Sequence, residues 1–390
     1  MKEVYVVAAV RTPVGKQKGY LREYKAPELL AASLKEAVQR IDMDPSLVDD
    51  VIVGCVYQVG EQGFNIARHG ALEAGFPESV PALSMNRQCG SSLSAIQTAY
   101  AMVGSGMMDI VVAGGVELMS KYTIMSDING TLYNGKPMGN PVTPFYKDKW
   151  GVPNQIASAQ MVADKWNITR EECWDFAVSS HQKAQAATEE GRFKNEIIAM
   201  KGLDKEGNEI KRVSDETIRP DTTREILQNL KVIDGTEWIT AGISSTITDG
   251  SSAVTVMSGE KVRELNLAPL ARIKANAVVG DDPKMMLTGP IPATPKVLEA
   301  ANLTMDDIDI FEVNEAFAPV PLAWAKELGA DMNKLNVNGG ALALGHPVGN
   351  TGCRISVSAI HELIRRNGKY ALVTLCTGGG LAPATVFERV

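Results

Sequence analysis

Short apolar runs alternate with helical patterns over the first third of the chain. Strand-like runs occupy residues 4–10, 48–60 and 108–120, and helical spacing of apolar side chains covers residues 26–41, 65–75 and 94–106. Strands that read as continuous apolar runs between helices are typical of a parallel sheet covered on both faces. The pattern therefore predicts an α/β fold built on a mostly parallel sheet.

The same order of patterns recurs near the C-terminus. Residues 270–280 correspond to the opening strand, 305–319 to the second strand, 336–364 to the last helix and 368–390 to the third strand. Matched order without close identity indicates an internal duplication. Two similar halves would each bury one face against the other.

The stretch between these halves has a different composition. Residues 127–155 are rich in Gly, Pro and Asn and predict a loop, and 203–212 suggest a polar hairpin. Helical patterns cover 157–166 and 170–193, and Thr169 is a plausible N-cap with a glutamate close behind. We therefore expect a first half at 1–119 completed by about 246–268, an insertion at 120–245 that could form a lid, and a second half at 269–390.

The overall composition is that of an ordinary globular protein. The chain has 390 residues, of which 45% are hydrophobic and 22% charged. A net charge of −7 argues against non-specific binding to nucleic acid, although a local basic pocket for an anionic ligand stays possible. No apolar run is long enough to cross a bilayer, and no clear secretory signal opens the chain, so a cytoplasmic location is predicted.

Five cysteines are spread widely along the chain. They are Cys55, Cys89, Cys173, Cys353 and Cys376. Their number is odd and none forms a CxxC pair, which argues against a disulfide framework or a zinc site. Most should therefore be small buried hydrophobic residues, and any exception must be argued from its surroundings.

Cys89 has unusual surroundings. It lies in "NRQCGSS", directly before a helical pattern that begins beyond Gly90. Backbone N–H groups and the dipole at a helix N-terminus stabilise an anion, so we expect a thiol of lowered pKa. Gly90 would let another group approach the sulfur. The alternative is a cysteine simply packed under the helix.

His346 is the histidine set in a glycine-dense stretch, "GGALALGHPVGNTGCR". Pro347 fixes the backbone directly after it, and a histidine held on such a loop can act as general base for a thiol. The alternative is a loop histidine with a structural hydrogen bond. His181 and His361 lie among charged neighbours on helical patterns, and we expect both on solvated surfaces.

Two further segments place polar groups at the ends of predicted strands. Cys376 ends an apolar run and is followed by three glycines, whose N–H groups could bind a ligand oxygen while the thiol transfers a proton. Asn314 and Glu315 follow "DIDIFEV", where side chains often face a ligand crevice. The alternatives are a buried cysteine before a plain turn, and a helix cap by Asn314.

Taken together, these motifs resemble those of the thiolase family. "NRQCGSS", "NEAFA", "NVNGGALALGHPVGNTG" and "CTGGG" occur in thiolase order and spacing, and the resemblance covers essentially the whole chain. It implies an α/β fold of five layers, α-β-α-β-α, made from two similar βαβαβαββ halves with a loop domain inserted in the first. It also implies a homodimer or a homotetramer.

The resemblance implies a role for each motif residue. Cys89 corresponds to the nucleophile that carries the acyl group, His346 to its base and Cys376 to the acid/base that acts on carbon. Asn314, with a water and His346, corresponds to a first oxyanion hole. The N–H groups of Cys89 and Gly378 correspond to a second.

It further implies contacts with substrate. Ser245 in "TAGISS" matches a residue that touches the pantetheine arm of coenzyme A, and Arg219 falls near a position that approaches the nucleotide. Met286 and Phe317 match residues that line the acyl pocket. Coenzyme A would be a co-substrate, with no permanently bound cofactor and no metal.

Some positions depart from thiolases specialised for short chains. Asn154, Gln155 and Ile156 replace a His-Met-Gly-like stretch, Ile243 replaces an asparagine, and Leu287 replaces a glycine. These changes favour acyl groups larger than acetoacetyl, steroid side chains included, with an acetoacetyl-CoA-specific enzyme as the alternative. A β-ketoacyl synthase would carry histidine or asparagine where this chain has Cys376, and a non-catalytic scaffold would have no need of the full set.

Overall fold

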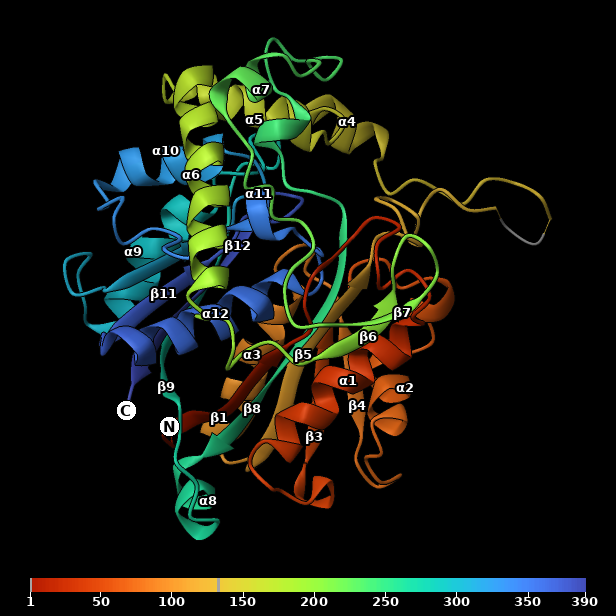
Figure 1. Cartoon of the computed structure of the whole chain (residues 1–390), viewed down its shortest axis with the longest axis vertical. Helices are drawn as coiled ribbons and strands as arrows, with labels where there is room; N and C mark the ends of the chain where they lie inside the picture. The colour runs from red at the N-terminus through yellow and green to blue at the C-terminus, as the bar shows by residue number, and fades with distance from the viewer. Residues whose placement is uncertain (1, 132–133) are drawn as a thin grey trace.

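Ten strands form one large sheet that runs through both halves of the chain (Figure 1). The computed structural model describes residues 2–131 and 134–390; residues 1 and 132–133, within the predicted first half and the predicted insertion, lie outside the described residues. The strand order is β10-β11-β12-β9-β1-β8-β5-β3-β4, with β2 paired to β8. Only Tyr5 and Val6 of β1 pair with β9, so this short contact joins the two halves of the sheet.

The strands alternate with helices as follows. The N-terminal half holds β1 (Val4–Arg11), β2 (Gly15–Lys16), α1 (Ala26–Gln39), β3 (Asp50–Gly54), α2 (Ile66–Glu73), β4 (Ala82–Met85), α3 (Ser91–Gly104), β5 (Ile110–Leu118), β8 (Thr248–Ser258) and α8 (Gly259–Glu264). The C-terminal half holds β9 (Ala271–Gly280), α9 (Pro290–Ala301), β10 (Ile310–Val313), α10 (Pro319–Leu328), α11 (Ala341–Leu344), α12 (Thr351–Arg366), β11 (Tyr370–Thr374) and β12 (Leu381–Arg389).

Three hydrophobic clusters separate five layers. One lies between α1, α2 and the outer face of the N-terminal part of the sheet. The second surrounds α3 and α12, which pack on each other between the two parts of the sheet. The third lies between the C-terminal strands and α9, α10 and a helix of the central segment, α5 (Gln155–Lys165). The expected α-β-α-β-α arrangement is therefore present.

The expectation of a mostly parallel sheet is wrong. Parallel pairing is confined to β10–β11, β3–β4 and β3–β5. The central strands β1, β8, β9 and β12 pair antiparallel with their neighbours. Of these four strands, β1, β8 and most of β12 are as deeply buried as the parallel strands β3 and β10. Continuous burial along a strand therefore does not reveal its direction. The apolar pattern also did not predict β4 or β8; β8 carries several serine and threonine side chains.

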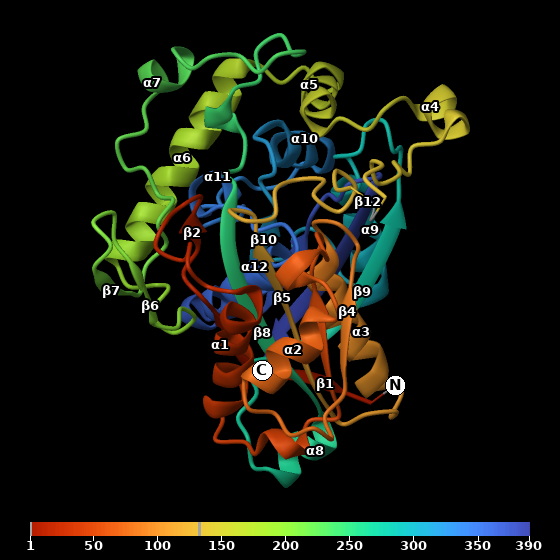
Figure 2. The same cartoon turned by 90° about the vertical axis from the view of Figure 1, so that its right-hand side faces the viewer.

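The segment between β5 and β8 combines helices, one hairpin and long irregular stretches in its described part. It contains α4 (Pro144–Trp150), α5 (Gln155–Lys165), α6 (Arg170–Glu189), the hairpin of β6 (Met200–Leu203) and β7 (Glu209–Arg212), and α7 (Arg224–Gln228). The N–H of Glu172 donates to Thr169 Oγ1 at 3.2 Å, and the Thr169 N–H donates to the Glu172 carboxylate at 2.7 Å. This capping box fixes the start of α6. Figure 2 shows α5, α6 and α7 above the C-terminal half.

Neither histidine expected on a solvated helix is fully exposed. His181 on α6 is 5% exposed, and its Nδ1 accepts from the N–H of Arg219 at 3.1 Å. His361 on α12 is half-buried, with Nε2 2.9 Å from the carbonyl oxygen of Ala9. In both cases a segment distant in sequence covers the helix. Among the described residues, no helix is both long and apolar enough to cross a membrane.

Candidate active site

A cavity of about 100 Å³ lies where the two halves and the insertion meet. Six of the expected site residues line it, namely Cys89, Ser245, Phe317, His346, Cys376 and Gly378. Val56, Tyr57, Gln88, Met119, Ile124, Gln155, Thr246, Ile247, Leu287, Ala316, Val348 and Thr377 complete its wall. A larger hollow of about 620 Å³ beside α6 contains none of the expected residues.

Cys89 lies in the turn before α3. Gln88 adopts a left-handed backbone conformation with φ 48°, and Gly90 is the N-cap of the helix. A Cβ atom on Gly90 would lie 2.7 Å from Cγ2 of Thr377 and 2.9 Å from Cδ of Pro383. Glycine is therefore required for the C-terminal half to approach this closely. The turn holds the thiol at the junction of the two halves.

The surroundings of Cys89 shift the pKa of its thiol in opposite directions. Burial raises its pKa to about 11, the N–H groups of Gly378 and Cys89 itself lower it, and the charge of Glu117 raises it. The expected low pKa is therefore wrong for the resting protein, because loss of hydration outweighs the donors at the helix N-terminus. The residue is still partly exposed, whereas the other four cysteines are buried.

His346 is held in one orientation by the start of α12. Its Nδ1 lies 2.7 Å from Oγ1 of Thr351, and that hydroxyl donates to the carbonyl oxygen of Pro347 at 2.9 Å. Since the hydroxyl hydrogen is used, Nδ1 carries the proton and donates to Thr351. Nε2 is then unprotonated, 3.4 Å from Nδ2 of Asn314. Burial, with repulsion from Arg354, lowers the pKa of His346 to about 3.

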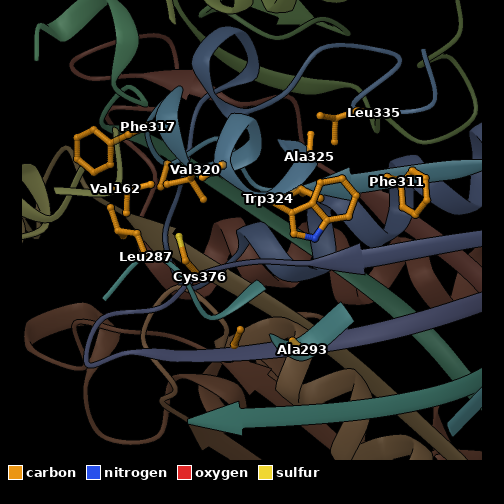
Figure 3. Close-up of a cluster of buried hydrophobic side chains, with 14 of the residues drawn as sticks. Val162, Leu287, Ala293, Phe311, Phe317, Val320, Trp324, Ala325, Leu335 and Cys376 are labelled. Carbon is orange, nitrogen blue, oxygen red and sulfur yellow. The ribbon is translucent and has the colours of Figure 1, made fainter. Parts of the chain in front are cut away.

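Cys376 is placed by the end of β11 and the turn into β12. The residue is 1% exposed and belongs to the C-terminal hydrophobic cluster, where it lies next to Leu287 (Figure 3). Gly379 and Gly380 have φ of 85° and 73°, values that suit glycine. Burial raises the pKa of Cys376, and the neighbouring Cys89 adds to the shift. Both thiols and the imidazole are thus neutral near pH 7.

Asn314 leaves β10 toward the same region. Its N–H donates to the carbonyl oxygen of Thr374 at 3.1 Å. Its Oδ1 is buried and has no hydrogen-bond partner among the described residues. A buried amide oxygen normally has a partner, so this position suits an ordered water or a polar substrate atom.

The "TAGISS" segment lies between two of the other motifs. The N–H of Ser245 donates to the carbonyl oxygen of Ala316 at 2.9 Å, beside Phe317. The N–H of His346 donates to the carbonyl oxygen of Thr246 at 3.4 Å. These hydrogen bonds join the segments around residues 245, 316 and 346, and Cys89 and Cys376 line the same cavity.

Besides Asn314, which contacts His346 but is not part of the cavity wall, two expected residues do not line the cavity. Arg219 does not line the cavity; its backbone supports His181. Met286 is 4% exposed and packs in the C-terminal hydrophobic cluster, while the next residue, Leu287, lines the cavity. No group of three or more His, Cys, Asp or Glu side chains in the described part of the chain is placed to hold a metal ion.

Sequence reasoning missed two polar residues at the site. Thr351 orients the imidazole and lies five residues after His346, at the start of α12. A hydroxyl residue so close to the histidine in sequence could have been recognised as its hydrogen-bond partner. Glu117, near Cys89, is a charged residue inside an apolar strand run, "IVVAGGVEL". A charge in such a position is rarely buried without partners.

Comparison with known proteins gives a consistent result. The family described as "Thiolase, N-terminal domain" matches residues 4–260, and "Thiolase, C-terminal domain" matches residues 267–389. A 3-ketoacyl-CoA thiolase of Pseudoalteromonas translucida is 44% identical, with 100% of each chain covered. A steroid 3-ketoacyl-CoA thiolase of Mycobacterium tuberculosis is 41% identical over 100% of this chain and 95% of its own length.

Solved structures agree over the full length. A human mitochondrial 3-ketoacyl-CoA thiolase superposes with a TM-score of 0.90 at 37% identity, covering 100% of this chain and 99% of its own. An acetyl-CoA acetyltransferase of Bacillus anthracis superposes with a TM-score of 0.91 at 38% identity, with the same coverage.

Proposed function

Because the chain belongs to the thiolase family, we propose that it cleaves 3-ketoacyl-CoA with coenzyme A, giving acetyl-CoA and a shortened acyl-CoA. The reaction is reversible, and its reverse is a Claisen condensation. The observation that supports it most directly is that Cys89, His346 and Cys376, from distant segments, line one cavity. Relatives named as thiolases give no support to a synthase or a scaffold.

In the first half of the reaction, the Cys89 thiol transfers its proton to Nε2 of His346. The sulfur attacks the 3-keto carbon, the C2–C3 bond breaks, and the acyl group stays on Cys89 as a thioester. The departing enolate takes the proton of the Cys376 thiol and becomes acetyl-CoA. Neutral Cys89 and His346 suit this sequence, since the charged pair forms only during attack.

In the second half, the thiol of coenzyme A gives its proton to the Cys376 thiolate. Its sulfur attacks the thioester, and the Cys89 sulfur leaves and regains the proton from His346. Every group then returns to its starting state. The two thiols have separate tasks because one sulfur must hold the acyl group while another group moves a proton on carbon.

Two sets of donors would stabilise the oxyanions. The N–H groups of Gly378 and Cys89 lie beside the Cys89 sulfur, where the acyl oxygen of the thioester would form. Asn314 and His346 lie 3.4 Å apart and could hold a water between them and the thioester oxygen of the enolate. Loss of one aimed donor costs about 3–4 kcal/mol in analogous sites.

The test is to trap the acyl-enzyme. After brief exposure to acetyl-CoA, acid quench and proteolysis, mass spectrometry should find one acetyl group, on the peptide that contains Cys89. A label on another cysteine, or none at all, would contradict the proposed nucleophile.

The acyl group is proposed to be larger than acetoacetyl. Gln155 and Leu287, two of the departures from short-chain thiolases, line the cavity. Relatives named for 3-ketoacyl-CoA, one of them for steroid 3-ketoacyl-CoA, support this choice. A panel of 3-ketoacyl-CoA substrates, followed by the loss of enolate absorbance with free coenzyme A, tests it. Highest kcat/KM for acetoacetyl-CoA would refute it.

For substrate contacts outside the reacting centre, we propose that Ser245 touches the pantetheine arm, because it lines the cavity. Phe317 would border the acyl group for the same reason. Arg219 lies outside the cavity, so a contact from it would reach only the nucleotide end of coenzyme A.

The protein is further proposed to act in the cytoplasm as a homodimer or homotetramer. All five cysteines are free thiols, which suits a reducing compartment. Strand β4 lies at the edge of the sheet, with Leu83 44% and nearby Phe64 93% exposed. An uncovered strand edge beside apolar side chains favours pairing with a second copy. Sedimentation equilibrium measures the assembly, and a monomer would refute it.

A further inference from the structure

Glu117 is a fully buried acid that no step above uses. It lies near the end of β5, on the face that carries Val111 and Ala113 into the middle layer. Gly115 lies between them and the acid, and a Cβ there would come within 2.6 Å of the carbonyl oxygen of Gly349. Successive residues on this face become smaller from Val111 to Ala113 and Gly115, which leaves room for the loop that carries His346.

The carboxylate is surrounded by hydrogen-bond donors. Its Oε2 accepts from the N–H groups of Val56 at 2.8 Å and Gly349 at 3.0 Å, and its Oε1 accepts from Gln62 Nε2 at 2.7 Å and the N–H of Tyr57 at 3.2 Å. The Cys55 thiol adds a weak contact at 3.9 Å. Burial raises the pKa of Glu117 to about 7, although these donors lower it. Only an acceptor on both oxygens satisfies the whole set, so the carboxylate form fits the site above that pH.

Three of these donors belong to the active site. Gly349 follows His346 on the same loop, and Val56 and Tyr57 line the cavity with Cys89. A Cβ on Gly349 would lie 2.5 Å from Glu117 Oε2. The imidazole loop of the C-terminal half is thus docked directly on an acid of the N-terminal half.

We propose that Glu117 is a positioning residue for the reaction, whose carboxylate fixes the His346 loop against the cavity wall so that Nε2 stays within reach of the Cys89 sulfur. The inference rests on the proposed roles of Cys89 and His346. Glu117 acts through these residues and does not touch the substrate.

Two possible roles of Glu117, one through its charge and one through positioning the His346 loop, predict opposite changes in the reactivity of the Cys89 thiol. The negative charge of Glu117 raises the pKa of Cys89. If charge alone mattered, Glu117→Gln would make Cys89 more acidic and speed its alkylation by iodoacetamide. If position matters, the amide N–H group faces backbone N–H donors, the loop withdraws, and alkylation slows because the imidazole no longer takes the proton.

The experiment compares Glu117→Gln with the wild-type full-length protein. We expect kcat for thiolysis to fall by about 10²-fold, KM to stay within about threefold, and alkylation of Cys89 at pH 8 to slow. Faster alkylation, or kcat within about threefold of wild type, would overturn the proposal.

Gln62→Leu is the matched control, because it removes another donor to the same carboxylate and leaves the Gly349 contact in place. It should lower Tm and leave kcat within about threefold of wild type. Gly349→Ala should reproduce the effect of Glu117→Gln, and it decides the question if Glu117→Gln does not fold; wild-type kcat in Gly349→Ala would overturn the proposal. Alkylation needs no turnover, so it still tests positioning if the wild type shows no thiolysis.

Discussion

Cys89 in the N-terminal half and Cys376 in the C-terminal half line one cavity but are held in different ways. Cys89 precedes a helix, is partly exposed and has N–H donors from two residues beside its sulfur. Cys376 follows a strand and is 1% exposed, and within the described part of the chain its own N–H is the backbone donor beside its sulfur. The surroundings of Cys89 can support an anion and then a thioester, whereas those of Cys376 keep the thiol protonated.

The comparison teaches that equivalent residue types acquire different roles from the element that carries them. A helix N-terminus supplies unpaired N–H groups, and a strand end supplies none beyond its own turn. The proposed base, His346, depends on both halves, because it comes from the C-terminal half and its loop contacts the N-terminal half through Gly349. The predictions below separate the tasks of the two thiols.

The largest effect is expected from Cys89→Ser. Thiolysis should fall by about 10⁴-fold or more, because the hydroxyl is a much weaker nucleophile and no acyl-enzyme accumulates. Steady-state kinetics and intact-protein mass after exposure to acetyl-CoA measure both effects. Cys173→Ala, which changes a buried cysteine of the insertion, is the control and should keep its activity. If the Cys89→Ser protein were acetylated and turned over normally, Cys89 would not be the nucleophile and the proposed division of tasks between the two thiols would be wrong.

Cys376→Ser should separate the two chemical steps. Carbon–carbon cleavage should fall by about 10²–10⁴-fold, the range of general acid catalysis, since the departing enolate loses its proton donor. Transfer of an acetyl group from acetyl-CoA to Cys89 should change much less, because the coenzyme A sulfur leaves readily as a thiolate and depends on the Cys376 proton far less than a leaving carbon does. Exchange of labelled coenzyme A into acetyl-CoA measures that step. An equal loss of both reactions would contradict a separate role for Cys376.

Alkylation should rank the five cysteines and report the acidity of the first. Cys89 should react with iodoacetamide at least about tenfold faster than the others, because it alone is partly exposed. With a pKa raised to about 11, its thiolate fraction and its rate should keep rising from pH 7 to pH 10. Peptide mass spectrometry measures the rates. A plateau near pH 7 would restore the low-pKa thiol, and equal labelling would contradict the comparison.

Leu287→Ala should change substrate preference without changing the chemistry. Removing a side chain from the cavity wall should raise the ratio of kcat/KM for bulky over small 3-ketoacyl-CoA by about tenfold. The rate of Cys89 acetylation should stay near that of the wild type. A ratio that does not move would show that the acyl group does not pass Leu287.

The smallest effect is expected from Arg219→Ala. An outer contact with a phosphate contributes about 1 kcal/mol or less, so KM for coenzyme A should rise only a few-fold, less at high salt, with kcat unchanged. Arg224→Ala, an exposed arginine that pairs with Asp175, is the control. Equal KM values for the two variants would remove Arg219 from the proposed contacts.

The sequence by itself determined the elements of the fold and the chemistry of the motifs. Apolar runs located β1, β3 and β5, and the helical spacing located α1 and α3, because burial on a face requires that periodicity. Glycines marked the close approaches, as at Gly90, where any side chain would meet the other half. These properties are local, so the residues themselves carry them.

Only the tertiary structure decided properties that depend on distant segments. The direction of β8 and β12, the choice of Leu287 over Met286 at the cavity, and the burial of His181 are set by packing partners far along the chain. The raised pKa of Cys89 has the same origin. A helix N-terminus can be seen in the sequence, but the loss of water around the sulfur arises only when both halves and the insertion close over it.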